Sequence, residues 1–135
     1  MKKMNYNSLA RIAIKAKKNA LPTYSKFFVG AALLTKDDKV FTGVNVESSS
    51  YSLTICAERT AVFKAISEGE RKFKAIAVAS DMKDFCPPCG ACRQVLWDLC
   101  GDIDMIMVNH KNEIQVKKMS EVLPFAFDNE KLKNV

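Results

Sequence analysis

Three cysteines and one glutamate have the residue types and the spacing of a catalytic metal site. Cys56 and Glu58 are separated by a single residue, and Cys89 and Cys92 form a Cys-x-x-Cys pair. That spacing lets two sulfurs on adjacent helical turns hold one zinc ion, and Cys56 would add a third sulfur from a separate element. Three protein ligands leave the fourth position to water, which distinguishes a catalytic zinc from a structural one. With Glu58 near enough to move protons on that water, the set predicts hydrolysis.

These residues resemble the signature of the zinc deaminases, His-x-Glu followed by Pro-Cys-x-x-Cys, in which the Glu is not a ligand. Here the first part reads Cys56-Ala57-Glu58, with Cys in place of His, and residues 88–92 read Pro-Cys-Gly-Ala-Cys. Cys at the first position is similar to the small homotetrameric cytidine deaminases that act on free nucleosides. The resemblance extends over nearly the whole chain, from Tyr24 to Phe127.

The resemblance implies one zinc ion per subunit on Cys56, Cys89 and Cys92. It also implies the hydrolytic deamination of cytidine and deoxycytidine to uridine and deoxyuridine plus ammonia, a step of pyrimidine salvage. Glu58 would relay the proton of the attacking water to N3 and then to the leaving ammonia. One carboxyl group can do both if burial brings its pKa near neutrality. Arg59 would donate hydrogen bonds to the ligand sulfurs and offset the excess negative charge of three thiolates, although a plain surface arginine is the alternative.

The resemblance also assigns the nucleoside contacts. Asn45 and Glu47 match the pair that binds the ribose hydroxyls, and residues two apart on a strand point to the same face. Phe27 would pack on the pyrimidine, and the backbone of Ala57 and Glu58 would meet the base edge. Without the resemblance, Asn45 and Glu47 would be interpreted as ordinary polar residues at the end of a strand. Phe27 would equally well be a residue of the hydrophobic core.

Two further aromatic residues bear on the oligomer that the resemblance implies. By the resemblance, Tyr51 would lie in a loop shared between subunits, and Phe127 would end a segment that reaches a neighbouring subunit's site. The active site would then be complete only in the homotetramer. The alternative is that this terminal cluster folds against its own subunit.

The periodicity of the chain predicts the elements that position these residues. A helix is expected over residues 6–20, a hairpin of strands over 28–34 and 40–46, and a helix over 55–69 with Thr54 as its N-cap and Gly69 just past its end. A strand over 74–80, a helix over 89–99 and strands near 105–108 and 114–116 complete the pattern. Alternating strands and helices favour a layered α/β domain. The family fold implied by the resemblance is a three-layer α/β/α, cytidine deaminase-like fold with a five-stranded mixed sheet, in one domain over residues 1–135.

Composition is that of an ordinary globular protein, with 48% hydrophobic and 27% charged residues among 135. No apolar run approaches the ~18 residues of a membrane span, and no apolar signal segment follows Met1-Lys2-Lys3. Five cysteines, an odd number, favour metal and free thiols in a reducing compartment, the cytoplasm, over a disulfide framework. The net charge is +6, but the lysines are spread along the chain with only small clusters at 15–18 and 117–118, so a nucleic-acid partner is not expected.

Two positions depart from the family pattern. Phe28 stands where a proline usually follows the matched Phe27, and Pro87 stands where serine is usual. Cys86 forms a second Cys-x-x-Cys with Cys89, although we expect Cys86 to take no part in metal binding.

Three rival functions remain at this stage. A structural zinc or iron–sulfur protein could use Cys86, Cys89, Cys92 and Cys100, but it leaves Cys56 and Glu58 unexplained, and Leu96 stands where a ferredoxin would have its fourth Cys. A polynucleotide-editing deaminase would use the same chemistry on a flipped base. A deaminase of a cytosine-containing antibiotic is the third. The Asn45 and Glu47 pair favours cytidine over both deaminase rivals.

Overall fold

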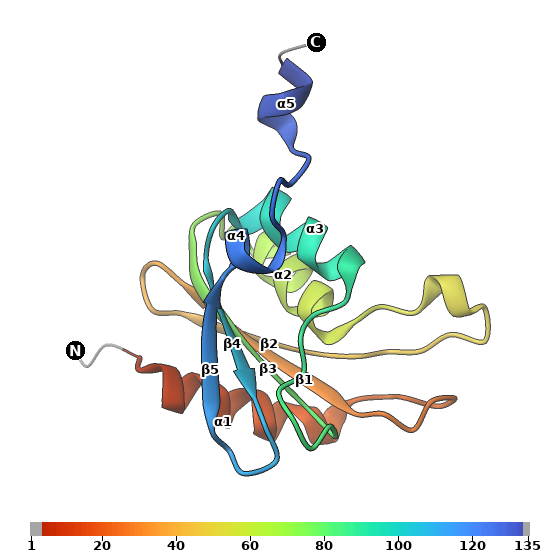
Figure 1. Ribbon diagram of the computed structural model, residues 1–135. Helices are drawn as coiled ribbons and strands as arrows, with labels where there is room; N and C mark the ends of the chain where they lie inside the picture. The colour runs from red at the N-terminus through yellow and green to blue at the C-terminus, as the bar shows by residue number, and fades with distance from the viewer. Residues whose placement is uncertain (1–3, 134–135) are drawn as a thin grey trace.

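A single mixed sheet forms the centre of the molecule in the computed structural model, which describes residues 4–133 (Figure 1). Its five strands run in the order β2-β1-β3-β4-β5. Their bounds are Val29–Thr35 for β1, Val40–Val44 for β2, Phe73–Ser80 for β3, Asp104–Val108 for β4 and Ile114–Lys118 for β5. β3 and β4 are parallel, and the other neighbouring pairs are antiparallel. The predicted hairpin and the predicted mixed sheet are both confirmed.

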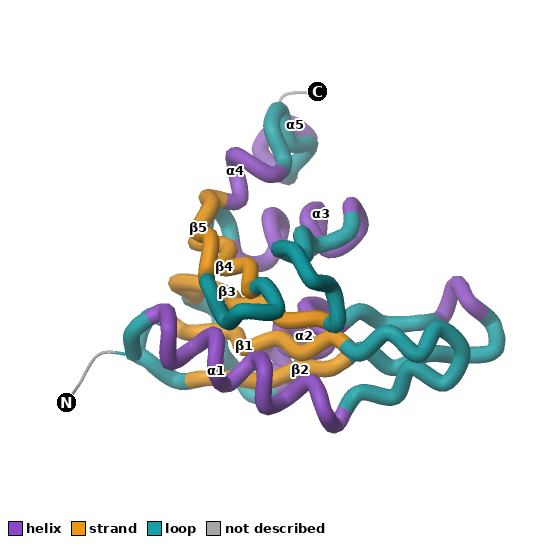
Figure 2. The backbone as a smooth tube through the Cα atoms, turned by 60° about the horizontal axis from the view of Figure 1, so that its bottom comes forward, coloured by secondary structure: helices purple, strands orange, loops and turns teal. Residues whose placement is uncertain are grey.

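Helices cover both faces of this sheet (Figure 2). α1 (Tyr6–Ala16) continues into the short 3₁₀ helix η1 (Lys17–Asn19) on one face, and α2 (Ala57–Ser67) and α3 (Gly90–Cys100) lie on the other. The remaining helical segments are short: η2 (Tyr51–Leu53), α4 (Met119–Val122) and α5 (Asn129–Lys133). The layers are therefore α/β/α, as predicted. In the described part of the chain, no helix combines the length and the apolar character that crossing a membrane requires.

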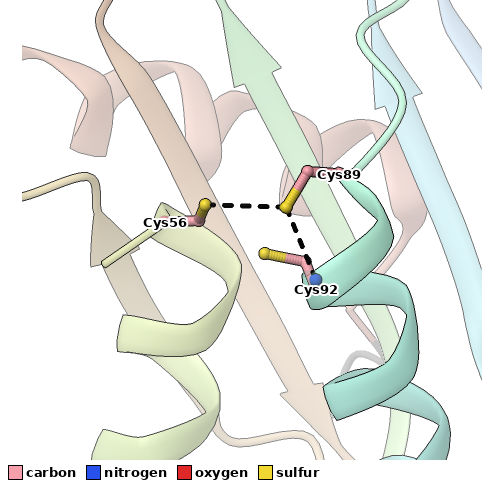
Figure 3. A group of neighbouring side chains, drawn as sticks. All are labelled: Cys56, Cys89 and Cys92. Atoms are coloured by element: carbon pink, nitrogen blue, oxygen red, sulfur yellow. Dashed lines mark hydrogen bonds between the residues drawn. The ribbon is translucent and has the colours of Figure 1, made fainter. Parts of the chain in front are cut away.

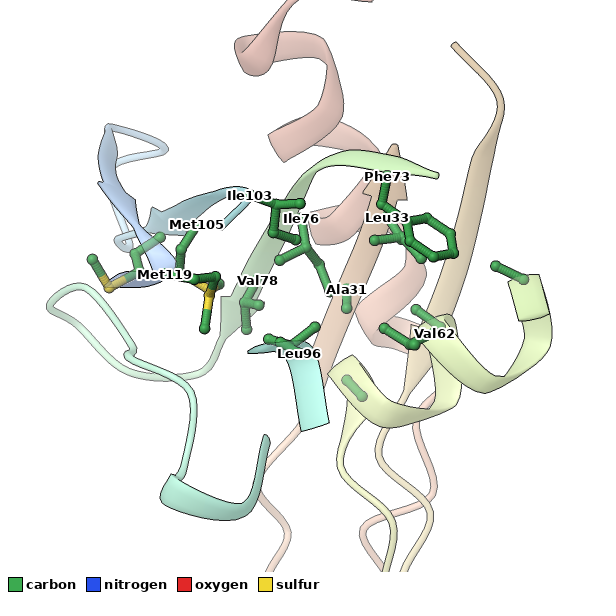
Figure 4. Packing of buried hydrophobic residues seen from close by; sticks show 14 residues of the cluster. Ala31, Leu33, Val62, Phe73, Ile76, Val78, Leu96, Ile103, Met105 and Met119 are labelled. Atoms are coloured by element: carbon green, nitrogen blue, oxygen red, sulfur yellow. The ribbon is translucent and has the colours of Figure 1, made fainter. Parts of the chain in front are cut away.

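The apolar character of β1 and β3 follows from this coverage, since a strand covered on both faces has no solvent side. Leu33 and Ile76 point into the cluster under α2 and α3 (Figure 4). Leu34 and Ala77 belong to the cluster under α1. Adjacent residues of one strand thus belong to different cores. The first of these clusters holds α2 and α3, the helices that carry the cysteines, against the sheet.

Two sequence predictions about the start and end of α2 have different outcomes. Thr54 is not the N-cap: that position belongs to Cys56, and the Thr54 hydroxyl instead accepts a hydrogen bond from the Ser48 backbone at 3.1 Å. The helix begins later because Ile55 is still paired with Val46 in an isolated bridge. Gly69 follows the helix with a φ of 98°, as expected for a residue at that position. The basic Met1-Lys2-Lys3 segment lies outside the described residues.

Gly43 sets the distance between β2 and α2. A Cβ atom at this position would lie 2.3 Å from the Ala57 carbonyl oxygen and 2.4 Å from the Ala61 nitrogen. We therefore expect Gly43→Ala to lower the free energy of unfolding by about 2–3 kcal/mol, because helix backbone cannot move aside as a flexible side chain would. Gly90→Ala is the matched control, since nothing lies within 4 Å of its added Cβ. Thermal unfolding of both variants checks this, and equal melting temperatures would contradict it.

Candidate metal centre and active site

The first turns of two helices bring the three cysteine sulfurs together. Cys56 is the N-cap residue of α2 and Cys89 the N-cap residue of α3, with Cys92 one turn further along α3. α2 and α3 pack side by side through buried residues such as Ala57 and Leu96, so their N-termini meet on the same face of the sheet. Helix N-termini carry partial positive charge, which favours thiolate over thiol.

The geometry of these sulfurs suits a single ion. The Sγ atoms of Cys56, Cys89 and Cys92 all lie within 4.8 Å of one another, and Cys56 Sγ is 3.8 Å from Cys89 Sγ (Figure 3). The Cys89 sulfur also accepts the Cys92 backbone N–H at 3.5 Å. Two of the three thiols, those of Cys56 and Cys89, line a cavity. A cluster of thiols from two elements with an open side is a donor set that zinc prefers. Among residues 4–133 it is also the one group of three or more such side chains close enough to hold a metal.

Arg59 lies beside this cluster. Its Nη2 donates to Cys56 Sγ at 3.4 Å, and among the described residues its buried Nε has no hydrogen-bond partner. Hydrogen bonds from Cys92, and then from Arg59 and Cys89, lower the pKa of Cys56 to about 5. The same pairing with Cys56, together with burial, raises the pKa of Cys92. The Arg59 guanidinium is thus placed where it can stabilise negative charge on the Cys56 sulfur.

Glu58 is a buried carboxyl group in the first turn of α2, with 4% of its surface exposed. Burial, and then the neighbouring Cys56 charge, raises the pKa of Glu58 to about 7. An acidic side chain is seldom buried without an ion pair, and within residues 4–133 Glu58 has none. Such a group can both accept and return a proton near neutral pH.

A cavity of about 280 Å³ lies against these groups. Of the residues that the sequence predicted, it brings together Phe27, Asn45, Glu47, Cys56, Ala57, Glu58 and Cys89. Cys92 is buried, and neither Cys92 nor Arg59 is part of the wall. The wall also contains four residues that were not predicted to belong to the site, which are Ser25, Val29, Thr54 and Val78. The sequence could have predicted Val29 as a residue of this wall, because side chains two positions apart on a strand point to the same face and Phe27 was already assigned to the site.

Asn45 and Glu47 hold the loop that precedes β1. Asn45 accepts from the Val29 backbone at 2.9 Å and donates to the Phe27 carbonyl at 2.7 Å. Glu47 accepts from the backbone N–H groups of Tyr24 and Ser25, both at 2.9 Å, and from the Ser25 hydroxyl. The hydrogen bond from the Ser25 hydroxyl is the largest of the contacts that lower the pKa of the Glu47 carboxyl group. Both side chains therefore reach the cavity wall as fixed polar groups that are already tied to Phe27 and Ser25.

Tyr51 and Phe127 lie outside the cavity. Tyr51 is 74% exposed, with its ring edge-on to Tyr24 at 5.8 Å between centroids, and Phe127 is 59% exposed. Tyr24 and Tyr51 form a second hollow that shares Ser25, Glu47 and Thr54 with the cavity. Phe127 lies near Trp97, at the base of α5, which projects away from the sheet (Figure 1). One chain by itself therefore leaves both aromatic side chains in solvent.

Cys86 lines the cavity without joining the cluster of sulfurs. The group of three close sulfurs consists of Cys56, Cys89 and Cys92, and burial raises the pKa of the Cys86 thiol. Its sulfur lies 3.7 Å from the Pro87 carbonyl oxygen, an arrangement for a neutral thiol donor. Cys100 is likewise a thiol whose pKa is raised, to about 12, by burial. The structure therefore argues against a four-sulfur site made of residues 86, 89, 92 and 100.

Three converging thiols beside a buried carboxyl group, on a three-layer α/β/α domain, indicate that the protein is a zinc-dependent hydrolase. Comparisons with known proteins narrow this class. A family model described as "Cytidine and deoxycytidylate deaminase zinc-binding region" matches residues 3–108. The chain belongs to this family.

Similar proteins cover nearly the whole chain. A cytidine deaminase of Halalkalibacterium halodurans is 52% identical over 125 residues, 92% of this chain and 95% of that protein. One from Sporosarcina psychrophila is 46% identical over 130 residues, 96% of both chains. The crystal structure of cytidine deaminase from Burkholderia pseudomallei superposes with a TM-score of 0.89 at 43% identity, covering 92% of this chain and all of that one. The resemblance read from the sequence is thereby confirmed, as is the fold class.

Proposed function

We propose that the protein is a zinc-dependent cytidine deaminase that hydrolyses cytidine and deoxycytidine to uridine and deoxyuridine with release of ammonia. The observation that carries this function is the buried Glu58 carboxyl group in a cavity whose wall also contains the thiols of Cys56 and Cys89. We assign the zinc to Cys56, Cys89 and Cys92, with Arg59 supporting the sulfurs. When bound, zinc supplies Lewis acidity that makes a water molecule a better nucleophile at neutral pH.

Glu58 carries the protons of the reaction. Its carboxylate takes one proton from the attacking water as the C4–O bond forms, and delivers it to N3 of the ring. It then transfers the second proton of that oxygen to the exocyclic nitrogen, which leaves as ammonia when the C4–N bond breaks. The oxygen remains on C4 as the carbonyl of uridine. Because Glu58 is buried in the wall of the cavity, a nucleoside that fills the cavity would separate this carboxyl group from bulk water.

The remaining residues of the cavity orient the nucleoside. Phe27 supplies a ring face for the pyrimidine, and the backbone of Ala57 offers hydrogen-bonding groups to its edge. Asn45 and Glu47 offer fixed polar atoms to the ribose, since the Phe27 segment and Ser25 already hold them in place. The negative charge of Glu47 disfavours a phosphate at the sugar end, so the proposed substrates are nucleosides.

A turnover assay on the zinc-loaded protein tests this function. Cytidine, deoxycytidine, their 5′-monophosphates, free cytosine and a cytosine-containing oligonucleotide would be compared by absorbance loss and ammonia release. We expect turnover of the two nucleosides only. Turnover of the monophosphates would contradict the role given to Glu47, and turnover of none would contradict the deaminase function itself.

We further propose that residues 1–135 form one domain and that four such chains assemble as a homotetramer. Neighbouring subunits would share their active sites. Support comes from large apolar side chains in solvent at the two projecting segments: Tyr51 at 74%, Leu53 at 67%, Phe125 at 100% and Phe127 at 59% exposure. Such a concentration of exposed aromatic surface is typical of an interface. The five free thiols among the described residues suit a reducing compartment, and we propose the cytoplasm.

Phe127→Ala tests the shared site. If the ring contacts nucleoside in a neighbouring subunit, its loss should raise KM for cytidine about tenfold while kcat changes less, because a stacked ring contributes about 1–1.5 kcal/mol of binding. Leu132→Ala, which removes an exposed apolar side chain from α5, is the matched control. Steady-state kinetics and sedimentation would be measured together. An unchanged KM in an intact tetramer would contradict the shared-site proposal.

A further inference from the structure

A basic hollow lies on the opposite side of β1 from the catalytic cavity. It measures about 670 Å³, and its lining consists of Arg11, Ile14, Lys15, Lys17, Lys18, Phe28, Asp81 and Asn112. Four of these side chains are cationic and one is anionic. The hollow shares no residue with the catalytic cavity.

The backbone around β1 explains why Phe28 faces this hollow. Phe27 and Val29 line the catalytic cavity, and side chains alternate along extended chain, so Phe28 between them points the other way. Its backbone N–H donates to Asp81 Oδ2 at 2.8 Å, which fixes the direction. The departure from the family pattern at Phe28 thus places an aromatic ring in the basic hollow, whose lining also includes Ile14, and Phe28 is not part of the wall of the catalytic cavity.

The cations around this ring are available to a ligand. Lys17 is held in place by an ion pair with Asp81 at 3.2 Å and by the Ser80 carbonyl at 3.2 Å. Within the described chain, Arg11, Lys15 and Lys18 pair with no carboxylate. They follow one another at intervals of four and three residues, which puts them on one face of the helical segment formed by α1 and η1. Three free cations on one face attract a compact polyanion.

We propose that this hollow is a second, non-catalytic binding site for a nucleoside di- or triphosphate. The base would lie on Phe28 and Ile14, and the phosphates would bind Arg11, Lys15 and Lys18. A mononucleotide fits better than a nucleic-acid strand, which needs successive aromatic platforms. The hollow on the far side of Lys15 and Lys18 has Lys64 but no aromatic residue in its lining, so these two adjoining hollows together offer one base-sized platform, the ring of Phe28.

Binding of ATP to the full-length protein tests this proposal without reference to turnover, so its failure is separate from failure of the deaminase function. Calorimetry at low ionic strength is expected to show one saturable site. Lys15→Glu with Lys18→Glu should weaken ATP binding at least about tenfold, because two attractions become repulsions. The control, Lys36→Glu with Lys72→Glu, changes net charge equally at two exposed lysines, and its affinity should stay within about twofold.

Phe28→Ala distinguishes the contribution of the base to ATP binding from the contribution of the phosphates. It should weaken ATP binding about fivefold and leave binding of inorganic tripolyphosphate unchanged. Equal losses in the two double variants, tripolyphosphate binding as tight as ATP, or displacement of ATP by saturating uridine would each overturn the proposal. Tighter binding of a single-stranded oligonucleotide, with several nucleotides per site, would overturn it in favour of a nucleic-acid surface.

Discussion

Glu58→Gln is expected to lower kcat for cytidine by about 10⁴-fold while the protein keeps one zinc ion per chain. The substitution preserves shape and burial but removes the ability to accept a proton, and general acid–base catalysis is worth about 10²–10⁴-fold per group. Since Glu58 is assigned both proton transfers, the upper end of that range applies. Steady-state kinetics and metal analysis of the same preparation provide the measurement.

A matched variant shows whether the loss belongs to this carboxyl group. Glu68 follows α2, is exposed, and lies away from the cavity. Glu68→Gln therefore makes the same chemical change without removing a carboxyl group from the active site. Its kcat should remain within about twofold of the parent, as expected for a surface position. Turnover retained in Glu58→Gln would refute the proton relay. Loss of turnover together with loss of zinc would instead make Glu58 a residue that maintains the metal centre.

Cys89→Ser should abolish stable zinc binding, whereas Cys86→Ser should not. Removing even a partner that only orients a zinc ligand weakens zinc binding about 10–100-fold, so loss of a ligand should weaken it at least about 100-fold. Cys86 is a closely matched control for Cys89, because both cysteines belong to the segment before α3 and both line the cavity. They differ in that Cys89 belongs to the group of three close sulfurs and Cys86 does not.

Zinc content after dialysis, together with competition against a chromophoric chelator, measures this difference. Cys86→Ser is expected to retain one zinc per chain with little change in affinity. Equal zinc loss in both variants would show that Cys86 takes part in the centre, and full zinc retention in Cys89→Ser would contradict the assigned ligand set.

Short-range sequence was enough to predict most of the elements. The helix that begins near Cys89, the helix that ends before Gly69 and the strands of the sheet follow from hydrophobic periodicity and from residues with special backbone preferences. The same is true of the candidate metal residues. A Cys-x-x-Cys at a helix start already places two sulfurs within one turn of each other, so their proximity does not depend on the rest of the fold.

Other features depended on contacts between distant segments. Thr54 resembled an N-cap in sequence, but the pairing of Ile55 with Val46 delays the start of α2 by two residues. Whether Cys86 or Cys56 completes the cluster could not be settled by spacing, because Cys86 and Cys89 show the same interval as Cys89 and Cys92. The packing of α2 beside α3 decided it, by bringing Cys56 to the start of α3.

What the sequence by itself determined is therefore the chemistry: three thiols, a carboxyl group and an arginine at intervals that suit a zinc hydrolase. Only the tertiary structure decided the environments in which these groups act. Burial of Glu58 requires β1, α2 and the segment before α3 to enclose it, and the opposite orientations of Phe27 and Phe28 require β1 to separate two hollows. The physical reason is that residue types and short spacings are local properties, whereas desolvation and side-chain direction depend on which surfaces pack together.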